Sequence, residues 1–368
     1  MWEAWLVHTQ TGQLTARLDV LSGSWEEAAD SGHISLEVSK QSLRSVEPAQ
    51  WLVPWRNSTL LTLDGLPVIG GPLTSVPRLG RTKVQIEAGS IHDIFAQRFA
   101  TTADHTDGAA LAQSTLTLDG WSLGSIGWRL VQAAMARRGG ALPIVHGTLD
   151  EAAAHIRTYP GYDITNLDVA HLLELLAGVI NGPDIRFDIE WADDEHRRVQ
   201  WVMRHGTMVS TDIPQDMVLT IDTTAVRGPV GEPEVICAWT PVSKLYATGA
   251  GQDSATLIAI AEDESLMMSM PLLEATMSDT STEELPLLQS RADARLARGR
   301  EMTVQVNVAI DTATGRYPSL WHPGDAATVV LGDEWWPLPE RMDGHIVGRS
   351  GEVGSSVVQV EIQSGVSL

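Results

Sequence analysis

The sequence predicts a mainly β protein with α/β insertions. Apolar and polar residues alternate near both ends of the chain, an Asp-Gly pair separates two alternating runs, and strong helical stripes occur in the middle. At 368 residues, the chain is longer than a single hydrophobic core usually supports. We therefore expect about two to four domains.

The first ~90 residues are predicted to form strands. Residues 34–38 alternate between apolar and polar types, which is typical of a strand with one buried face. Asp64-Gly65 lies between two apolar runs and is a strong β-hairpin signal. Ser90 is expected to cap a short helix, because Asp93 follows three residues later. The strands expected here are residues 2–7, 34–38, 60–64, 66–70 and 84–86.

The middle of the chain is predicted to be helical. Apolar residues recur at i, i+3, i+4 and i+7 over residues 123–135, and the helix is expected to end at Gly139-Gly140. A second helix is predicted from about residue 167 to residue 180, with Thr165 or Asn166 as its N-cap. Both apolar stripes are interpreted as core-facing surfaces.

The rest of the chain is predicted to return to strands, with one helix. Residues 185–203 resemble a hairpin whose charged turn is 193–195. Residues 281–284, Ser-Thr-Glu-Glu, form a capping-box pattern, which predicts a helix with its apolar stripe over residues 285–296. Further strands are expected at about 217–221, 257–261, 304–310, 326–331 and 358–362.

Composition and charge exclude several classes of protein. Hydrophobic residues make up 43% and charged residues 20% of the chain, a globular composition. The net charge of −22 repels phosphate backbones, so specific nucleic-acid binding is not expected. Apolar runs fall short of the roughly 18 residues of a membrane helix, and residues 1–7 do not resemble a signal peptide. We expect neither a membrane anchor nor export through the general secretory route.

The single cysteine, Cys237, lies in an apolar run that is predicted to be a buried strand. One cysteine cannot form an intrachain disulfide or a thiolate zinc site. Cys237 is therefore interpreted as a small core residue.

Two glycine-containing segments superficially resemble enzyme motifs. Residues 249–251 begin like a dinucleotide fingerprint, but Ser254 stands where the third glycine belongs, so a β-turn is predicted. Residues 124–127 resemble a nucleophile elbow, but Leu123 replaces its first glycine, so a helix start is predicted.

Acidic and histidine residues do not form a convincing site either. Residues 193–196 are interpreted as a solvated hairpin turn, since the EF-hand pattern is absent, and residues 262–264 as a solvated loop. The eleven histidines are scattered, with no metal-ligand spacing. We assign no catalytic, cofactor-binding or metal-ligating residue, and we expect a protein that is not an enzyme and needs no cofactor.

Several short motifs occur in a characteristic order. They are Trp5-Leu6-Val7, Thr11-Gly12, Ser22-Gly23-Ser24-Trp25, Pro54-Trp55-Arg56, the hairpin at 63–72, the Arg-Thr-Tyr-Pro-Gly-Tyr-Asp run at 157–163, Thr248-Gly249-Ala250-Gly251 and Pro323-Gly324-Asp325. Together they resemble the tail-hub (baseplate hub) minor tail proteins of long-tailed bacteriophages that infect actinobacteria.

The resemblance implies the phage tail hub fold, in which two tube-like antiparallel β-barrel domains carry two inserted domains. The first barrel would comprise residues 1–100, and the second would comprise 206–238 together with 302–368. An α/β domain would occupy 101–205, and a second insertion with strands and a helix would occupy 239–301.

The resemblance also implies a structural virion protein made in the host cytoplasm and placed at the tail tip. It would be a homotrimeric hub at the distal end of the tail tube. Its partners would be the distal tail ring protein, the tape measure protein and the tail fibre or tip proteins. Because the chain is acidic, we expect the genome to pass through an acidic lumen without being retained.

Two other functions remain open at this stage: a carbohydrate-binding or adhesin-like tail protein, and a cell-wall or glycan hydrolase of the tail tip. The tryptophan pairs Trp51/Trp55 and Trp335-Trp336 are compatible with the first, although tryptophan also anchors protein interfaces. For Trp335 and Trp336 we predict an interface role. In an extended segment, one ring would enter the barrel core and the other would face a neighbouring chain or loop.

Overall fold

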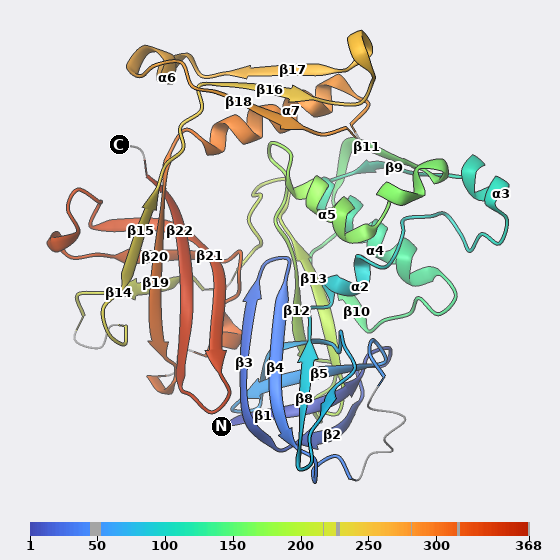
Figure 1. Ribbon diagram of the computed structural model, residues 1–368, viewed down its shortest axis with the longest axis vertical. Helices are drawn as coiled ribbons and strands as arrows, with labels where there is room; N and C mark the ends of the chain where they lie inside the picture. The colour runs from blue at the N-terminus through green and yellow to red at the C-terminus, as the bar shows by residue number, and fades with distance from the viewer. Residues whose placement is uncertain (45–52, 216, 226–228, 281, 315–316, 367–368) are drawn as a thin grey trace.

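A computed structural model describes residues 1–368 except 45–52, 216, 226–228, 281, 315–316 and 367–368. The described strands form five sheets. In Figure 1 the N-terminal strands lie at the bottom, the C-terminal strands at the left, an α/β region at the right and a small sheet with a helix at the top. The predicted order of β, α/β and β elements is confirmed.

The chain begins in a four-stranded sheet with the order β2-β1-β5-β6. Its hairpin turns at Asp64 and Gly65, whose φ angles of 51° and 82° are both positive, as a type I′ turn requires. The predicted hairpin is therefore confirmed. The strands are β1 (Trp2–His8), β2 (Leu14–Leu18), β5 (Asn57–Leu63) and β6 (Leu66–Pro72).

A ten-stranded sheet joins the two ends of the chain. Strand β21 pairs with β20 over its first residues, and with β3 over Gly348 to Glu352. The strands of this ten-stranded sheet are β3 (Val20–Ala28), β4 (Gly32–Ser39), β7 (Arg78–Leu79), β8 (Lys83–Ala88), β14 (Leu219–Asp222), β15 (Glu234–Ala238), β19 (Met302–Asp311), β20 (Ala326–Val330), β21 (Arg341–Glu352) and β22 (Val357–Val366).

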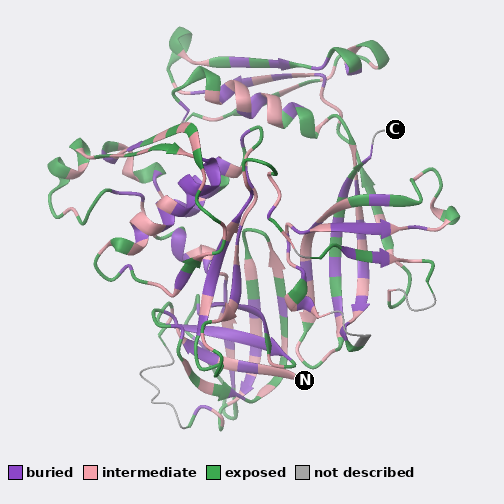
Figure 2. Cartoon of the chain, turned by 180° about the vertical axis from the view of Figure 1, so that it is seen from behind, coloured by how far each residue is buried: buried purple, intermediate pink, exposed green. Residues whose placement is uncertain are grey.

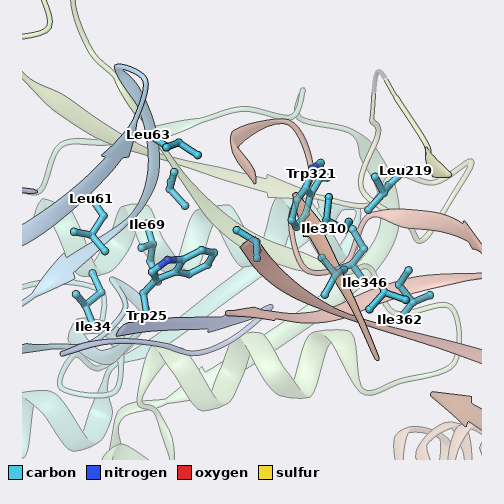
Figure 3. Close-up of a cluster of buried hydrophobic side chains, with 14 of the residues drawn as sticks. Trp25, Ile34, Leu61, Leu63, Ile69, Leu219, Ile310, Trp321, Ile346 and Ile362 are labelled. Carbon is cyan, nitrogen blue, oxygen red and sulfur yellow. The ribbon is translucent and has the colours of Figure 1, made fainter. Parts of the chain in front are cut away.

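One hydrophobic core runs under both β regions. Figure 3 shows Trp25, Ile34 and Leu61 from the N-terminal region in one cluster with Trp321 and Ile346 from the C-terminal region. The two expected barrel domains thus share a core. The pairing among the described strands runs openly from β15 to β7 and closes no barrel. The division into four domains stays a prediction.

A second core is built around helices α4 and α5 of the α/β region, and Val7 of β1 and Leu60 of β5 also belong to it. Ser122 caps α4 and Asp168 caps α5 through side-chain hydrogen bonds to backbone N–H groups. The prediction of Thr165 or Asn166 as the second cap was wrong, because these residues belong to the preceding 3-10 helix η1 (Gly161–Asn166). The other elements are α2 (His92–Phe95), α3 (Gly108–Gln113), β9 (Thr115–Trp121), α4 (Leu123–Ala136), β10 (Ile144–His146), β11 (Ala152–Pro160), α5 (Val169–Ala177), β12 (Ile185–Trp191) and β13 (Val199–His205).

Helix α2 is a single turn with a different cap from the one predicted. Ile91 is the N-cap residue and makes no side-chain cap bond. The Asp93 carboxylate instead accepts a hydrogen bond from the Ser90 backbone N–H at 3.0 Å. The carboxylate half of a capping box is present, while the Ser90 hydroxyl is buried without a partner.

The top layer consists of three strands over helix α7 and encloses a third core. The helix is confirmed, but Glu284 is its N-cap and makes no side-chain cap bond, and residue 281 lies outside the described residues. The helix therefore does not begin at the predicted capping-box serine, but three residues later, after Glu284. The elements are β16 (Lys244–Thr248), β17 (Ile258–Glu262), α6 (Glu264–Ser269), β18 (Glu274–Ser278) and α7 (Leu285–Arg298).

Two predictions of burial were wrong. Asp263, expected in a solvated loop, is buried, caps α6 and pairs with Arg300 at 2.6 Å. Cys237 lies in strand β15 as predicted, but it is exposed rather than part of the core. Figure 2 shows the contrast between the buried strands of the two β regions and the exposed margins of the molecule. Among the described helices, none is long and apolar enough to cross a membrane.

Candidate functional site

The most elaborate polar cluster lies where the two β regions and the α/β region meet. Its first part is Arg349 of β21, whose side chain is fully buried. Its guanidinium contacts the Glu27 carboxylate of β3 through Nε at 2.6 Å and through Nη2 at 2.5 Å. It also donates to the backbone oxygens of Val68 at 2.8 Å and of Trp321 at 2.7 Å. One side chain therefore binds three separate segments of the chain.

Two indole rings flank this guanidinium. The Trp25 and Trp321 ring centroids each lie 5.7 Å from the Arg349 guanidinium carbon. A cation at this distance from an aromatic face is attracted by the ring quadrupole, more strongly when it is desolvated. The two largest side chains of the shared core are thus fixed around one buried charge.

The second part of the cluster is centred on Asp188 of β12. Its two carboxylate oxygens accept from Arg186 Nε at 2.7 Å and from Arg204 Nε at 2.8 Å. Arg186 also pairs with Asp325, which follows the loop before β20. This second set of ion pairs joins the α/β region to the C-terminal β region.

His322 links the two parts. Its Nδ1 lies 3.2 Å from Nη2 of Arg349 and 3.7 Å from a carboxylate oxygen of Asp188. Because the guanidinium can only donate, Nδ1 accepts and carries no proton. Burial, together with the nearby guanidinium groups, lowers the pKa of His322 to about 3. The imidazole is therefore neutral across the physiological pH range.

Burial opposes the charged form of both carboxylates in the cluster, with different results. It raises the pKa of Glu27 even against the opposite charge of Arg349. For Asp188, burial also acts to raise the pKa, but the surrounding positive groups outweigh it, so this pKa is lowered.

A cavity of about 30 Å³ beside these groups has room for about one water molecule. We refer to residues Glu27, Arg186, Asp188, Arg204, His322, Asp325 and Arg349 as the ionic junction.

Most members of the ionic junction are buried, and Arg204 is the most exposed, with 32% of its side chain accessible. A buried ion network holds its members in one geometry, because any displacement would leave a desolvated charge without a partner. Of the residues in the ionic junction, Asp325 belongs to a recognisable sequence motif, Pro323-Gly324-Asp325. No local sequence signal distinguishes the others.

A second cluster, a histidine pair in the α/β region, was also missed. The Nε2 atoms of His146 and His205 lie 2.9 Å apart, and Trp128 stacks on His146 at 4.6 Å. His205 Nδ1 donates to the Gly206 carbonyl at 2.7 Å, so its Nε2 accepts from His146. Burial and the neighbouring His205 lower the pKa of His146 to about 4, despite the nearby Asp150. Within the described residues, no three potential ligand side chains gather as a metal site would require.

The predicted interface tryptophans lie in a short 3-10 helix, η5 (Asp333–Trp335), and directly after it, rather than in an extended segment. Trp335 packs partly buried against the shared core, whereas Trp336 is 85% exposed. Their interface role stays a prediction. Of the other aromatic pair, Trp55 is 39% exposed and Trp51 lies outside the described residues.

The segments that resembled enzyme motifs have structural places. Residues 124–127 form the first turn of α4, as predicted. Residues 249–251 form the connection that leads from β16 toward β17, with Gly251 at a φ of 121°. Residues 193–196 form the turn between β12 and β13, where His196 stacks on Trp191.

Sequence comparisons identify no relative: no family model matches the chain, and no curated protein matches it. Solved structures do match. A tail protein from Neisseria meningitidis MC58 aligns over 99% of this chain and 96% of its own, with 14% identity and a TM-score of 0.56. The chain has the fold of phage tail proteins. The 43 kDa tail protein of prophage MuSo2 from Shewanella oneidensis matches equally well, over 99% and 98% of the two chains, at 14% identity and a TM-score of 0.56.

The similarity to these tail proteins extends over almost the whole chain, since the alignments span 99% of it. The predicted fold class is confirmed at that level. The ionic junction lies at the centre of this fold, where the separate regions are joined.

Proposed function

We propose that this chain is a structural, non-enzymatic virion protein that forms a trimeric hub at the distal end of a phage tail tube. It joins the tube to tail-tip and fibre proteins. The observation that carries the proposal is the end-to-end similarity to two tail proteins, one of them from a prophage, which leaves no large region outside the shared fold. Partners in this proposal are the distal tail ring protein, the tape measure protein and the fibre or tip proteins.

The ionic junction supports a structural role. A hub transmits force between the tube above it and the fibres below it, so its parts need a fixed relative orientation. Arg349 and Arg186 each connect segments that are far apart in the chain. Such a junction resists rotation of one region against another, because rotation would expose or unpair buried charges.

The charge of the chain supports a position around the path of the genome. Each chain carries −22, and a channel walled by low-dielectric protein focuses the field of its lining charges. An acidic lumen lets DNA slide, whereas a basic one would retain it through the phosphates. The proposal therefore includes a net acidic inner wall.

Trp336 extends the proposal to a contact surface. An 85% exposed indole is an unusual side chain to leave in water, and tryptophan is enriched at the centres of protein interfaces. We assign this ring to a contact with a neighbouring tail protein, while Trp335 anchors the segment on the shared core.

The test is the oligomeric state and the position of the chain. Mass photometry of the purified chain, followed by reconstruction of assembled tail tips, is expected to show a threefold ring below the tube. A chain that stays monomeric in an assembled tail tip would refute the hub proposal. A threefold ring elsewhere in the particle would refute only its position.

A further inference from the structure

Strand β15, at one end of the ten-stranded sheet, is mostly apolar, and all of its residues except Val235 are exposed. Ile236 is 44% exposed and Trp239, just beyond the strand, is 39% exposed. β15 pairs only with β19, and no backbone hydrogen bond from the described residues reaches its other edge. An exposed apolar edge strand pairs readily with another chain.

The register shows that part of the core face is uncovered as well. Cys237 lies opposite Val304 and points to the same face of the sheet. Val304 is completely buried, yet Cys237 is exposed. Val235, two residues before Cys237 on the same face, still packs against the shared core. The covering layer therefore reaches the start of β15, and among the described residues it leaves Cys237 open to a contact with another chain.

The opposite end of the same sheet is a complementary edge. There, β7 pairs with β8 and with no other described strand, and Val76 and Leu79 are 65% and 56% exposed. Arg78 and Arg81 are also exposed at this end, whereas Glu232 and Glu234 are exposed beside β15. One end of the sheet is apolar and acidic, and the other is apolar and basic.

We infer that the β15 edge of one copy binds the segment Val76–Arg81 of the next copy, so that the sheets of neighbouring subunits join end to end. This inference rests on the proposed function, in which copies form a closed ring. A contact between two different surfaces of the same chain is head-to-tail, and repeated head-to-tail contacts close into a ring when the rotation between copies closes, which in the proposed trimer takes three copies. Pro77 has no N–H group, so the backbone pairing is restricted to the residues after it.

Cross-linking through the single native cysteine tests the contact. In the variant Leu79→Cys, a short bismaleimide is expected to join Cys237 of one copy to position 79 of the next. The products would be covalent dimers and trimers. Three controls are expected to give no trimer: the unmodified chain, the double variant Cys237→Ser/Leu79→Cys, and Val209→Cys, which places a thiol at a 95% exposed position elsewhere.

A charged residue placed on the β15 edge provides a second, independent test of the contact. Ile236→Lys, on the β15 edge, is expected to weaken trimer association at least tenfold in mass photometry and sedimentation. Ile258→Lys is the matched control, because Ile258 is a 55% exposed isoleucine on a strand of the separate top sheet. It is expected to leave association unchanged, and circular dichroism checks that both variants fold.

The outcomes separate the inference from the proposed function. A trimer that gives no cross-link between Cys237 and the thiol introduced at position 79, or that is insensitive to Ile236→Lys, overturns the contact and leaves the hub intact. Covalent dimers of the unmodified chain would show a twofold pairing of β15 with itself, which overturns the contact too. A chain that is monomeric both at about 100 μM and in tail tips overturns both.

Discussion

Replacing Arg349 with methionine should destabilise the protein more than any other single loss of an arginine in β21. The substitution keeps much of the side-chain volume but removes the guanidinium. The Glu27 carboxylate would then be buried without its partner, and the carbonyl oxygens of Val68 and Trp321 would lose their donor. Breaking a buried pair from one side costs about 3–5 kcal/mol, a large share of a typical total of about 5–15 kcal/mol.

Urea unfolding followed by tryptophan fluorescence is the appropriate assay, since Trp25 and Trp321 flank the guanidinium. Arg341→Met is the matched control. Arg341 lies in the same strand, its side chain is 66% exposed, and its pair with Asp343 is at the surface. The control is expected to show no measurable change.

A double-mutant cycle distinguishes a paired charge from simple packing. Glu27→Gln removes the carboxylate charge that Arg349→Met would leave unpaired. The double variant should therefore lose less free energy than the two single variants together, by about 1 kcal/mol or more. Additive losses, or a loss below about 1 kcal/mol for Arg349→Met alone, would refute the view that the ionic junction holds the regions together.

Three further predictions concern the histidine pair, a glycine and DNA. The pKa of His146 is lowered to about 4 in the folded protein, so below about pH 6.5 the unfolded chain is protonated at this histidine before the folded chain is. As the pH falls from about 6.5 to about 4, the stability of the wild type should therefore decline more steeply than that of His146→Gln, which thermal unfolding measures. Gly124→Ala places a Cβ directly against the His205 ring and should lower the free energy of unfolding by about 1–3 kcal/mol. Gly108→Ala is the control, because a Cβ there meets open space, and it should not destabilise the protein. Equal effects of the two variants in chemical denaturation would contradict the packing argument. Finally, a gel-shift assay at low salt should show no retention of duplex DNA, because low salt strengthens any electrostatic attraction, and retention would argue against an acidic lumen.

Local features of the fold were predictable because a few neighbouring residues determine them. The turn at Asp64-Gly65 requires two positive φ angles, and these two residue types adopt them readily. The apolar period of α4 was equally direct. Caps were less reliable: Asp168, rather than Thr165 or Asn166, starts α5, since several capping residue types occur together there.

Features that depend on distant segments were not predictable. Glu27, Asp188 and Arg349 look like ordinary strand residues until the fold brings them together. The exposure of Cys237 likewise depends on segments that are distant in the sequence. Its apolar neighbours predicted burial, but burial depends on which segments cover each side chain, and Cys237 is exposed. The fold class was therefore accessible from the sequence, while the ionic junction and the exposure of Cys237 were not.

The pairing of β21 with β3 has a consequence for biosynthesis. The paired residues Ala28 and Gly348 are 320 positions apart. At about 5–20 residues per second, the ribosome needs roughly 15–65 s to deliver the partner of β3 after β3 itself emerges. During that interval one edge of β3 has no strand beside it, and the shared core lacks its C-terminal half. The nascent chain is therefore exposed to premature association until β21 has been synthesised and has paired with β3.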